Sequence, residues 1–350
     1  MVLDAQKVEI LVEKFLIIQT AFIGDAILTL PMIQKLKELN PDCLIDVITI
    51  PQTAVIFSHS PSVNSIHIFD KKGKHKSLYH LYKFAGFLKK GNYSRIYAPH
   101  RSFRTSLLVM FTGVKETYGF NFNSMRHIYK HLTDYQNARH EVERNLHLIN
   151  FPAEREGWRI LPGIKLPSET VDKIENFFSV SGDNGDFAAI APGSVWNTKI
   201  YPPEYTEQVI SFLVTKFRRV FLIGGDNDRK ICEELESKFP ETVKSVAGMF
   251  NLIESVAFLK KMKILVTNDS APSHLGMCAD IPVLMIYCST VPDFGFYPYN
   301  KKSYFLSYND LACKPCGIHG FERCPLKHFE CGYKLKPETV INKIEEMINA

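Results

Sequence analysis

Short apolar runs alternate with amphipathic stretches along the first half of the chain. Residues 15–19, 44–50 and 96–98 have the continuous apolar character of buried strands. Residues 26–39 carry apolar side chains at helical spacing, and residues 105–112 show a second helical pattern. Strands separated by helices pair in parallel, so this half is expected to form an α/β sheet.

The same alternation starts again after a segment rich in proline and glycine. Residues 151–167 contain Pro152, Pro162, Gly163 and Pro167, which predicts a linker between domains. Strands are expected beyond it at residues 188–191, 220–223, 264–267 and 283–287. Helices are expected at residues 203–217, from about residue 228, at 270–278 and at 337–348. Two Rossmann-like halves in tandem bind ligands in the cleft between them, at the carboxyl ends of the strands.

The length of the chain agrees with this division. A chain of 350 residues exceeds the usual size of a single core, so two domains are expected. We place an N-terminal domain at residues 1–165 and a second at 166–336, which includes a cysteine-rich segment at 313–331. A C-terminal helix at 337–350 completes the chain.

Composition and targeting signals narrow the class of protein. Hydrophobic residues make up 45% and charged residues 23%, as in ordinary globular proteins. No apolar run approaches the roughly 20 residues that a membrane span requires. Residues 1–14 carry Asp4, Glu9 and Glu13, so we predict no signal peptide. We therefore expect a cytoplasmic protein whose cysteines are mostly reduced.

Charge is distributed unevenly. Residues 1–150 hold 19 basic and 12 acidic residues, a net +7, whereas the remaining 200 residues hold 23 basic and 25 acidic ones, a net −2. One interpretation is a solvated basic face, and the other is an N-terminal half that meets an anionic partner. Nucleic acid is not favoured as that partner, because no long Lys/Arg run alternates with aromatic residues.

The first candidate for chemistry lies between the first strand and its helix. Gly24 lets the backbone approach a ligand closely, and Asp25 lies at the start of the helix, at the cleft edge. The alternative, which a Gly-Asp pair on its own favours, is that Asp25 only caps the helix. The Gly-x-Gly-x-x-Gly fingerprint is absent after this strand, which weakens a dehydrogenase interpretation.

Two further turns follow predicted strands in the second half. In residues 191–202, Ser194 and the turn amides can donate to a phosphate, and Lys199 can add a point charge. The alternative is an ordinary loop with a surface lysine. Gly225 and Asp226 lie in a strand-end turn that could approach a nucleoside.

The third candidate is the turn before the predicted helix at residues 270–278. Free amides at a helix N-terminus bind pyrophosphate well. Asp269 could accept from sugar hydroxyls, Ser270 could reach a phosphate, and His274 lies one turn into the helix. The alternative is a capped helix with a histidine whose hydrogen bonds are satisfied internally.

Four cysteines lie close together near the end of the chain, and their spacing fits no standard zinc ribbon. They are Cys313, Cys316, Cys324 and Cys331. They could hold structural zinc or an iron–sulfur cluster, form a disulfide, or pack as reduced thiols. No convincing Asp-x-Asp metal motif follows a predicted strand.

Taken in order, these segments resemble the ADP-heptose:lipopolysaccharide heptosyltransferases of glycosyltransferase family 9. The likeness extends from residue 15 to the terminal helix, and the spacing of His100 and Arg104 is similar to the family's arginine-bearing segment. Residues 291–294 and the late Cys-x-x-Cys resemble heptosyltransferase II more than heptosyltransferase I. The resemblance implies a GT-B fold, an α/β architecture of two Rossmann-like domains facing each other across a cleft.

The resemblance also implies roles for individual residues in an inverting transfer that requires no cofactor. Asp25 matches the catalytic base, and Lys199 matches the group that stabilises the departing diphosphate. The donor-binding residues would be Gly24, Ser194, Lys199, Gly225, Asp226, Asp269, Ser270, Ala271 and His274. The acceptor-binding residues would be His100, Arg101, Arg104 and Arg126. The family usually has glycine at position 271, so the extra methyl of Ala271 can crowd the donor.

The implied partners are ADP-heptose and the inner core of lipopolysaccharide, as heptosyl-Kdo-lipid A, met at the cytoplasmic face of the inner membrane. Another family-9 enzyme with a different acceptor remains an alternative. So does a nucleotide-sugar epimerase, which shares the two-domain architecture. A non-enzymatic alternative is a degenerate sugar-nucleotide-binding protein, of which Ala271 would be a symptom.

Overall fold

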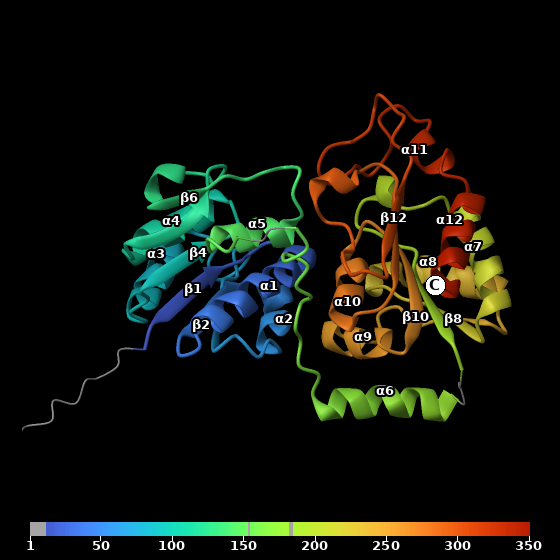
Figure 1. Cartoon of the computed structure of the whole chain (residues 1–350), viewed down its shortest axis with the longest axis horizontal. Helices are drawn as coiled ribbons and strands as arrows, with labels where there is room; N and C mark the ends of the chain where they lie inside the picture. The colour runs from blue at the N-terminus through green and yellow to red at the C-terminus, as the bar shows by residue number, and fades with distance from the viewer. Residues whose placement is uncertain (1–11, 153–154, 182–184) are drawn as a thin grey trace, which may run out of the picture. The chain divides into compact units, whose positions relative to one another are not determined.

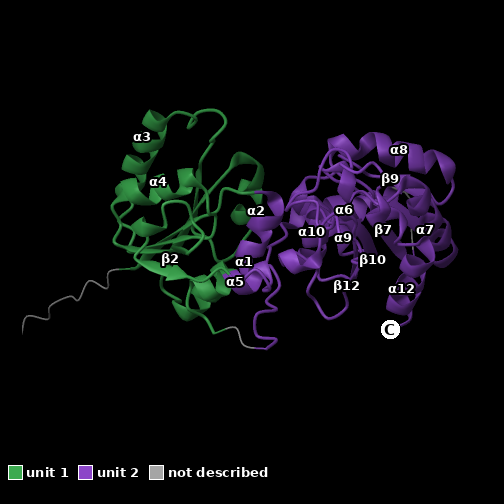
Figure 2. Cartoon of the chain, turned by 90° about the horizontal axis from the view of Figure 1, so that it is seen from above, with its two compact units in different colours: residues 1–21, 32–135, 145–152 green, residues 22–31, 136–144, 153–350 purple. Residues whose placement is uncertain are grey.

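The computed structural model describes residues 12–152, 155–181 and 185–350. The prediction that no signal peptide is present depends partly on Asp4 and Glu9, which lie outside the described residues, as do residues 153 and 154 of the expected linker. The chain forms two compact units (Figure 2). The first unit comprises residues 1–21, 32–135 and 145–152, and the second comprises residues 22–31, 136–144 and 153–350. The expected domain boundary at residue 165 stays a prediction.

The first unit is built on a sheet of six parallel strands in the order β3-β2-β1-β4-β5-β6. The strands are β1 (Lys14–Ile18), β2 (Leu44–Thr49), β3 (Ser65–Ile68), β4 (Arg95–Ala98), β5 (Glu116–Phe120) and β6 (His131–Thr133). In the register of the central strands, Ile17 of β1 pairs with Val47 on one side and Tyr97 on the other. The three apolar runs expected to be strands in this half are all confirmed.

Helices connect these strands and cover the sheet (Figure 1). They are α1 (Ile23–Leu39), α2 (Ala54–Ser58), α3 (Leu78–Lys89), α4 (Phe103–Thr112) and α5 (Glu141–Leu148), and α1 and α5 each continue into the second unit. Ser77 and Ser102 cap α3 and α4 by accepting hydrogen bonds from backbone amides of the first turn. Leu81, Leu88 and Leu108 of these two helices share one buried cluster with β1 and β4.

The second unit contains another sheet of six parallel strands, in the order β12-β11-β10-β7-β8-β9. The strands are β7 (Phe187–Ala191), β8 (Arg219–Leu222), β9 (Val243–Ser245), β10 (Met262–Asn268), β11 (Val283–Tyr287) and β12 (Tyr304–Ser307). The helices are α6 (Ser168–Ser181), α7 (Pro203–Lys216), α8 (Arg229–Lys238), α9 (Leu252–Leu259), α10 (Ala271–Ala279), α11 (Glu330–Tyr333) and α12 (Pro337–Asn349).

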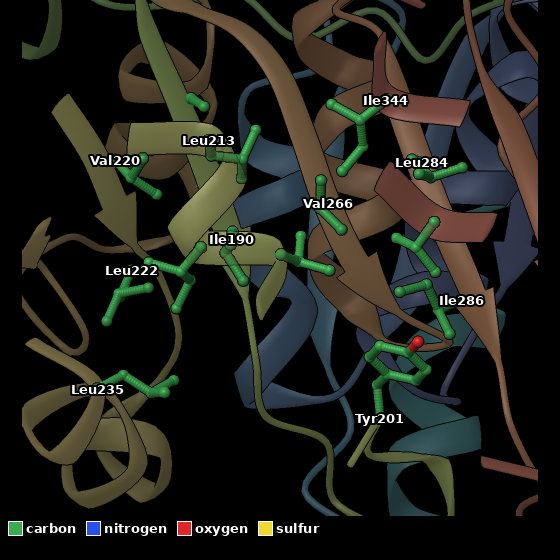
Figure 3. Packing of buried hydrophobic residues seen from close by; sticks show 14 of the residues in the cluster. Ile190, Tyr201, Leu213, Val220, Leu222, Leu235, Val266, Leu284, Ile286 and Ile344 are labelled. Atoms are coloured by element: carbon green, nitrogen blue, oxygen red, sulfur yellow. The ribbon is translucent and has the colours of Figure 1, made fainter. Parts of the chain in front are cut away.

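The core of this unit joins its central strands to three helices (Figure 3). Side chains of β7, β8, β10 and β11, such as Ile190 and Val266, meet Leu213 of α7, Leu235 of α8 and Ile344 of α12. These positions are all at most 3% exposed. The terminal helix expected from the sequence is therefore an integral part of the second core, because its apolar stripe is buried against the sheet.

The two sheets have the same topology. Numbered along the chain within its own unit, each sheet runs in the order 3-2-1-4-5-6, the doubly wound Rossmann arrangement. In such sheets ligands bind at the carboxyl ends of the strands where the winding reverses. That switch point lies between β1 and β4 in the first unit and between β7 and β10 in the second. The main candidate segments of the sequence follow these four strands.

Among the described residues, no helix is both long enough and apolar enough to cross a membrane.

Candidate functional site

The turn between β10 and α10 is hydrogen-bonded to the turn that follows β7. The Asn268 side chain donates to the Pro192 carbonyl at 2.8 Å and accepts from the Tyr201 amide at 3.0 Å. Ser270 is the N-cap residue of α10 and adopts an extended conformation, so that the helix begins at Ala271. The first amides of α10 thus face the space beside the β7 turn, at the switch point of the sheet.

A partly buried ion pair spans the same two turns. The Lys199 Nζ lies 2.6 Å from Oδ2 of Asp269, and each side chain is 12% exposed. The Thr290 hydroxyl, in the loop after β11, donates to the same carboxylate oxygen at 2.7 Å. These two contacts hold the lysine beside the N-terminus of α10, where the free helix amides attract anions.

His274 is buried in the first turns of α10, at 4% exposure. Burial lowers its pKa to about 4, and the nearby Lys199 ammonium acts in the same direction, whereas Asp269 opposes it. The imidazole is therefore neutral at pH 7. Its Nδ1 has no hydrogen-bond partner in the part of the chain that the structure describes. A neutral ring can donate to or accept from a bound sugar without adding charge.

Gly24 and Asp25, which belong to the second unit, lie in the first turn of α1. A Cβ added at Gly24 would lie 2.8 Å from Cδ2 and 2.9 Å from Nε2 of His274, closer than such atoms approach one another. Glycine is thus required by the imidazole itself. The neighbouring Asp25 accepts from the Phe22 amide at 3.3 Å, so it caps the helix.

The expected acceptor residue His100 follows β4 in the first unit. Its Nδ1 lies 2.7 Å from the Thr20 hydroxyl and 3.0 Å from that of Thr105. Lys71 donates to the Thr20 carbonyl at 2.7 Å. Burial lowers the pKa of His100 to about 4, with Lys71 and Arg101 adding to the effect. The switch point of the first sheet thus carries a neutral imidazole among hydroxyl groups and cations.

The three expected acceptor arginines have different surroundings. Arg101 precedes α4, and its guanidinium stacks over Tyr135 at 3.9 Å from the ring centre. Arg104 lies inside α4 and donates to the carbonyls of His75 and Lys76, which braces the turn before α3. Arg126 is exposed in a short 3-10 helix. The Ser124 amide donates to the Arg101 carbonyl at 3.2 Å, so the segment that precedes Arg126 lies beside Arg101.

A family model for glycosyltransferase family 9 (heptosyltransferase) matches residues 81–322, more than half of the chain. The chain belongs to glycosyltransferase family 9. It is 23% identical over 333 residues to lipooligosaccharide heptosyltransferase 2 of Campylobacter jejuni, a match that covers 93% of this chain and 96% of the relative. The chain is therefore a glycosyltransferase, as predicted.

Solved structures of this class have the same fold. A family-9 glycosyltransferase from Veillonella parvula matches with a TM-score of 0.83 at 20% identity, covering 96% of this chain and 97% of that one. The ADP-heptose lps heptosyltransferase II of E. coli matches with a TM-score of 0.77 at 19% identity, covering 96% and 98%. These matches confirm the α/β GT-B fold class with its two Rossmann-like sheets.

The remaining donor candidates of this family-9 chain border the β7 turn. The Asp228 carboxylate packs against Gly193 and accepts from the Gly225 amide at 2.8 Å, which brings the turn after β8 beside the turn after β7. Ser194 is half-buried in that β7 turn. Asp226 is exposed and pairs with Arg229 at 2.8 Å, so its carboxylate already has a cationic partner.

The cysteine-rich segment contacts the Lys199 turn, which the sequence did not predict. Thr198 donates its amide to the Phe321 carbonyl at 3.0 Å, and the Phe321 amide donates to the Thr198 hydroxyl at 2.8 Å. The Cys316 amide donates to the Ser289 carbonyl at 2.8 Å. No signal in the sequence shows these contacts or that of Thr290, because the partners are far apart along the chain.

The four clustered cysteines are free thiols in this structure. Among the described residues, no group of three or more His, Cys, Asp or Glu side chains is arranged to hold a metal ion, and structural zinc stays a hypothesis. Burial raises the pKa of Cys331 to about 11 and also raises that of Cys316.

Proposed function

We propose that the chain is an inverting heptosyltransferase of the heptosyltransferase II type, which transfers heptose from ADP-heptose to the inner core of lipopolysaccharide. The observation that carries the proposal is the Lys199–Asp269 pair at the N-terminus of α10, where the helix amides and the lysine would bind a diphosphate. The names of the C. jejuni and E. coli relatives support the choice of sugar and acceptor.

In the proposed reaction, Asp25 takes the proton of an acceptor hydroxyl while the hydroxyl oxygen attacks the anomeric carbon of the donor. The bond between that carbon and the diphosphate oxygen breaks, and ADP leaves. A single displacement by one oxygen inverts the configuration of the anomeric carbon. Lys199 and the first amides of α10 stabilise the charge that develops on the leaving diphosphate.

The other donor residues have supporting roles in this proposal. Ser194 and Ser270 would donate to the phosphates, while Gly225 and Asp226 would border the nucleoside. The neutral His274 would donate to a heptose hydroxyl or accept from one, as its pKa of about 4 allows. Ala271 is the first residue of α10 and does not have a positive φ, so its methyl group causes no backbone strain there.

We propose that the reaction needs no cofactor, because Lys199 and the helix amides supply the charge that a divalent cation would otherwise provide. Transfer by the purified protein should therefore persist in EDTA. A loss of activity that magnesium restores would contradict this part of the proposal. Structural zinc on the cysteine-rich segment stays a separate hypothesis, and elemental analysis of the purified protein tests it.

The acceptor is proposed to meet His100, Arg101, Arg104 and Arg126 of the first unit. Its phosphates and carboxylates match the net +7 of residues 1–150. Since lipid A anchors this acceptor in a bilayer, we propose that the protein works at the cytoplasmic face of the inner membrane as a peripheral protein.

One assay distinguishes the proposed activity from its alternatives. The purified protein is incubated with ADP-heptose, with and without heptosyl-Kdo-lipid A, and both ADP and heptosylated lipid are measured. We expect ADP release that depends on the acceptor and equals the heptose transferred. Release of ADP without acceptor would indicate an epimerase or hydrolase, and binding of ADP-heptose without any turnover would indicate a degenerate binding protein.

A further inference from the structure

One segment of the first unit contains basic residues and no acidic ones. From residue 71 to residue 115 the chain has 11 Lys and Arg residues and no Asp or Glu. The nearest acidic residue before it, Asp70, accepts hydrogen bonds from the backbone amides of residues 72 to 74 at 2.8 to 3.3 Å. Its carboxylate therefore shapes the turn that presents the exposed Lys72, Lys74 and Lys76.

The helix that follows this turn exposes large apolar side chains. One side of α3 is buried through Leu81 and Leu88. On the other side Leu78, Tyr79 and Tyr82 are 62%, 60% and 62% exposed. Three such residues within two helical turns form an apolar patch of the kind that marks an interaction surface.

The basic and apolar features share one surface. The Lys83 ammonium lies 4.6 Å from the centre of the Tyr79 ring. The Tyr82 ring packs edge-on against Phe111 of α4 at 5.3 Å, and the two helices lie side by side in Figures 1 and 2. We call this surface the α3 face. It comprises Leu78, Tyr79 and Tyr82 together with Lys72, Lys74, Lys76 and Lys83.

We propose that the α3 face docks the protein on an anionic phospholipid bilayer. Leu78, Tyr79 and Tyr82 would enter the headgroup layer, where tyrosine rings are favoured because they combine an apolar body with a polar tip. The lysines would contact the lipid phosphates, and their long side chains can follow the interface. The absence of acidic residues over the whole segment removes repulsion from the anionic surface.

Docking through the α3 face deepens the proposed function. Only the biological purpose of the docking rests on that function. An enzyme whose acceptor is anchored by lipid A gains from staying at the bilayer between turnovers. The docking itself is a physical property of the α3 face, so it can be measured without donor or acceptor.

The first experiment measures flotation of the full-length protein with phosphatidylcholine vesicles that contain or lack 30% phosphatidylglycerol. We expect binding only to the anionic vesicles, weakened by high salt. Replacing Leu78, Tyr79 and Tyr82 together by Ser should weaken binding by about tenfold or more, because buried apolar area is lost. Replacing Lys72, Lys74, Lys76 and Lys83 together by Gln should weaken it by about fivefold per lysine.

Matched controls come from the second unit. Val180→Ser and Leu326→Ser together remove exposed apolar side chains, at 80% and 61% exposure. Replacing Lys230, Lys260, Lys263 and Lys302 by Gln removes four exposed positive charges. Both controls should bind anionic vesicles as the wild type does. If they weaken binding as much as the α3 variants, attraction is a property of the whole surface and the proposal is wrong.

The second experiment tests insertion. Tyr82→Trp places an indole on the α3 face, and Tyr304→Trp places one at an exposed position of the second unit. We expect a blue-shifted emission and quenching by brominated lipids for the first variant, measured as the difference from the wild type with its native Trp158 and Trp196. No shift at position 82 would overturn the insertion of this helix.

The third experiment separates docking from catalysis. Transfer to a deacylated, water-soluble acceptor should be the same in the wild type and the α3 variants, which also shows that the variants fold. If vesicle binding depends on the α3 face while no acceptor is heptosylated, the docking holds and the proposed function fails. If the substitutions dissociate a dimer and leave vesicle binding unchanged, the face joins two copies of the chain and the proposal is wrong.

Discussion

Asp25 combines a structural and a chemical role at one side chain. Its carboxylate accepts from the Phe22 amide, so an aspartate here caps α1 whether or not it also acts as a base. An asparagine can keep that hydrogen bond through its amide oxygen, but it cannot take a proton at neutral pH. The substitution Asp25→Asn therefore separates the two interpretations that the sequence left open.

We expect Asp25→Asn to lower the transfer rate by about a thousandfold or more, because general-base catalysis contributes on this scale. The dissociation constant for the donor should change little. Single-turnover kinetics and calorimetric titration with ADP-heptose in the absence of acceptor measure the two quantities. Near-normal turnover in a folded variant would remove Asp25 from the mechanism.

Lys199 and Asp269 should behave as a coupled pair. Lys199→Met removes the ammonium and should weaken ADP binding by about tenfold to a hundredfold, the range for a hydrogen bond to a charged group. Asp269→Asn keeps a partner for the Thr290 hydroxyl but no longer fixes the lysine. The double variant should lose less than the sum of the single losses. Additive losses in binding would show that the ion pair does not position Lys199.

Gly24 is expected to tolerate no side chain. In Gly24→Ala the new methyl would meet the buried His274 ring at 2.8 Å, so the variant should lose thermal stability and activity together. Removing the obstacle in a Gly24→Ala/His274→Ala variant should restore the melting temperature. Gly86→Ala is the matched control, because nothing lies within 4 Å of its added methyl in α3. It should stabilise by about 0.5–1 kcal/mol, and a comparable loss there would contradict the steric argument.

At the scale of elements, strands with continuous apolar sequences could be predicted, whereas short strands that mix polar and apolar residues could not. The four strands at the two switch points are buried on both faces, so their sequences show the pattern plainly. The strands β3, β6 and β9 lie toward the sheet edges and are short and partly polar, as in Ser65–Ile68 and His131–Thr133. They form through pairing with a neighbouring strand, which a local pattern does not encode.

The candidate site follows the same logic. Sequence reasoning could select Gly24, Asp25, Lys199 and Asp269 as candidates because each lies in the segment that follows a clear strand. Parallel sheets bind ligands at these strand ends. Thr290 and the contact between Thr198 and Phe321 were not, because they depend on tertiary packing of distant segments.

The turn before α3 gives a test of the acceptor assignment. Arg104 braces this turn through the His75 and Lys76 carbonyls, and Asp70 braces it through three backbone amides. If Arg104 contacts the acceptor, Arg104→Ala should raise the acceptor KM by about tenfold to a hundredfold and leave the donor KM nearly unchanged. Asp70→Ala loosens the same turn without removing the arginine. Equal effects of both variants would mean that Arg104 acts only through the turn.

At the scale of the whole molecule, histidines whose pKa is lowered in the fold should make stability depend on pH. Burial lowers the pKa of His100 and His274 to about 4 and that of His140 to about 3. His140 stacks on Trp158, accepts from the Val142 amide at Nδ1 and lies 2.9 Å from the Tyr297 carbonyl through Nε2. The ring is therefore held as the neutral tautomer with its proton on Nε2.

The sign of the effect follows from proton binding. An unfolded histidine has a pKa near 6.5, so between about pH 6.5 and pH 4 the unfolded chain binds more protons than the folded one. The full stabilisation is present above pH 6.5 and is lost as the pH falls, by at most about 1.4 kcal/mol per pH unit for each histidine.

Urea denaturation at pH 7, 6 and 5 measures the slope. In His140→Gln, whose amide can still donate to Tyr297, the slope should be shallower by about one proton. His127→Gln is the control, because that side chain is exposed, and it should leave the slope as in the wild type. An unchanged slope in His140→Gln would show that this histidine is not held neutral by the fold.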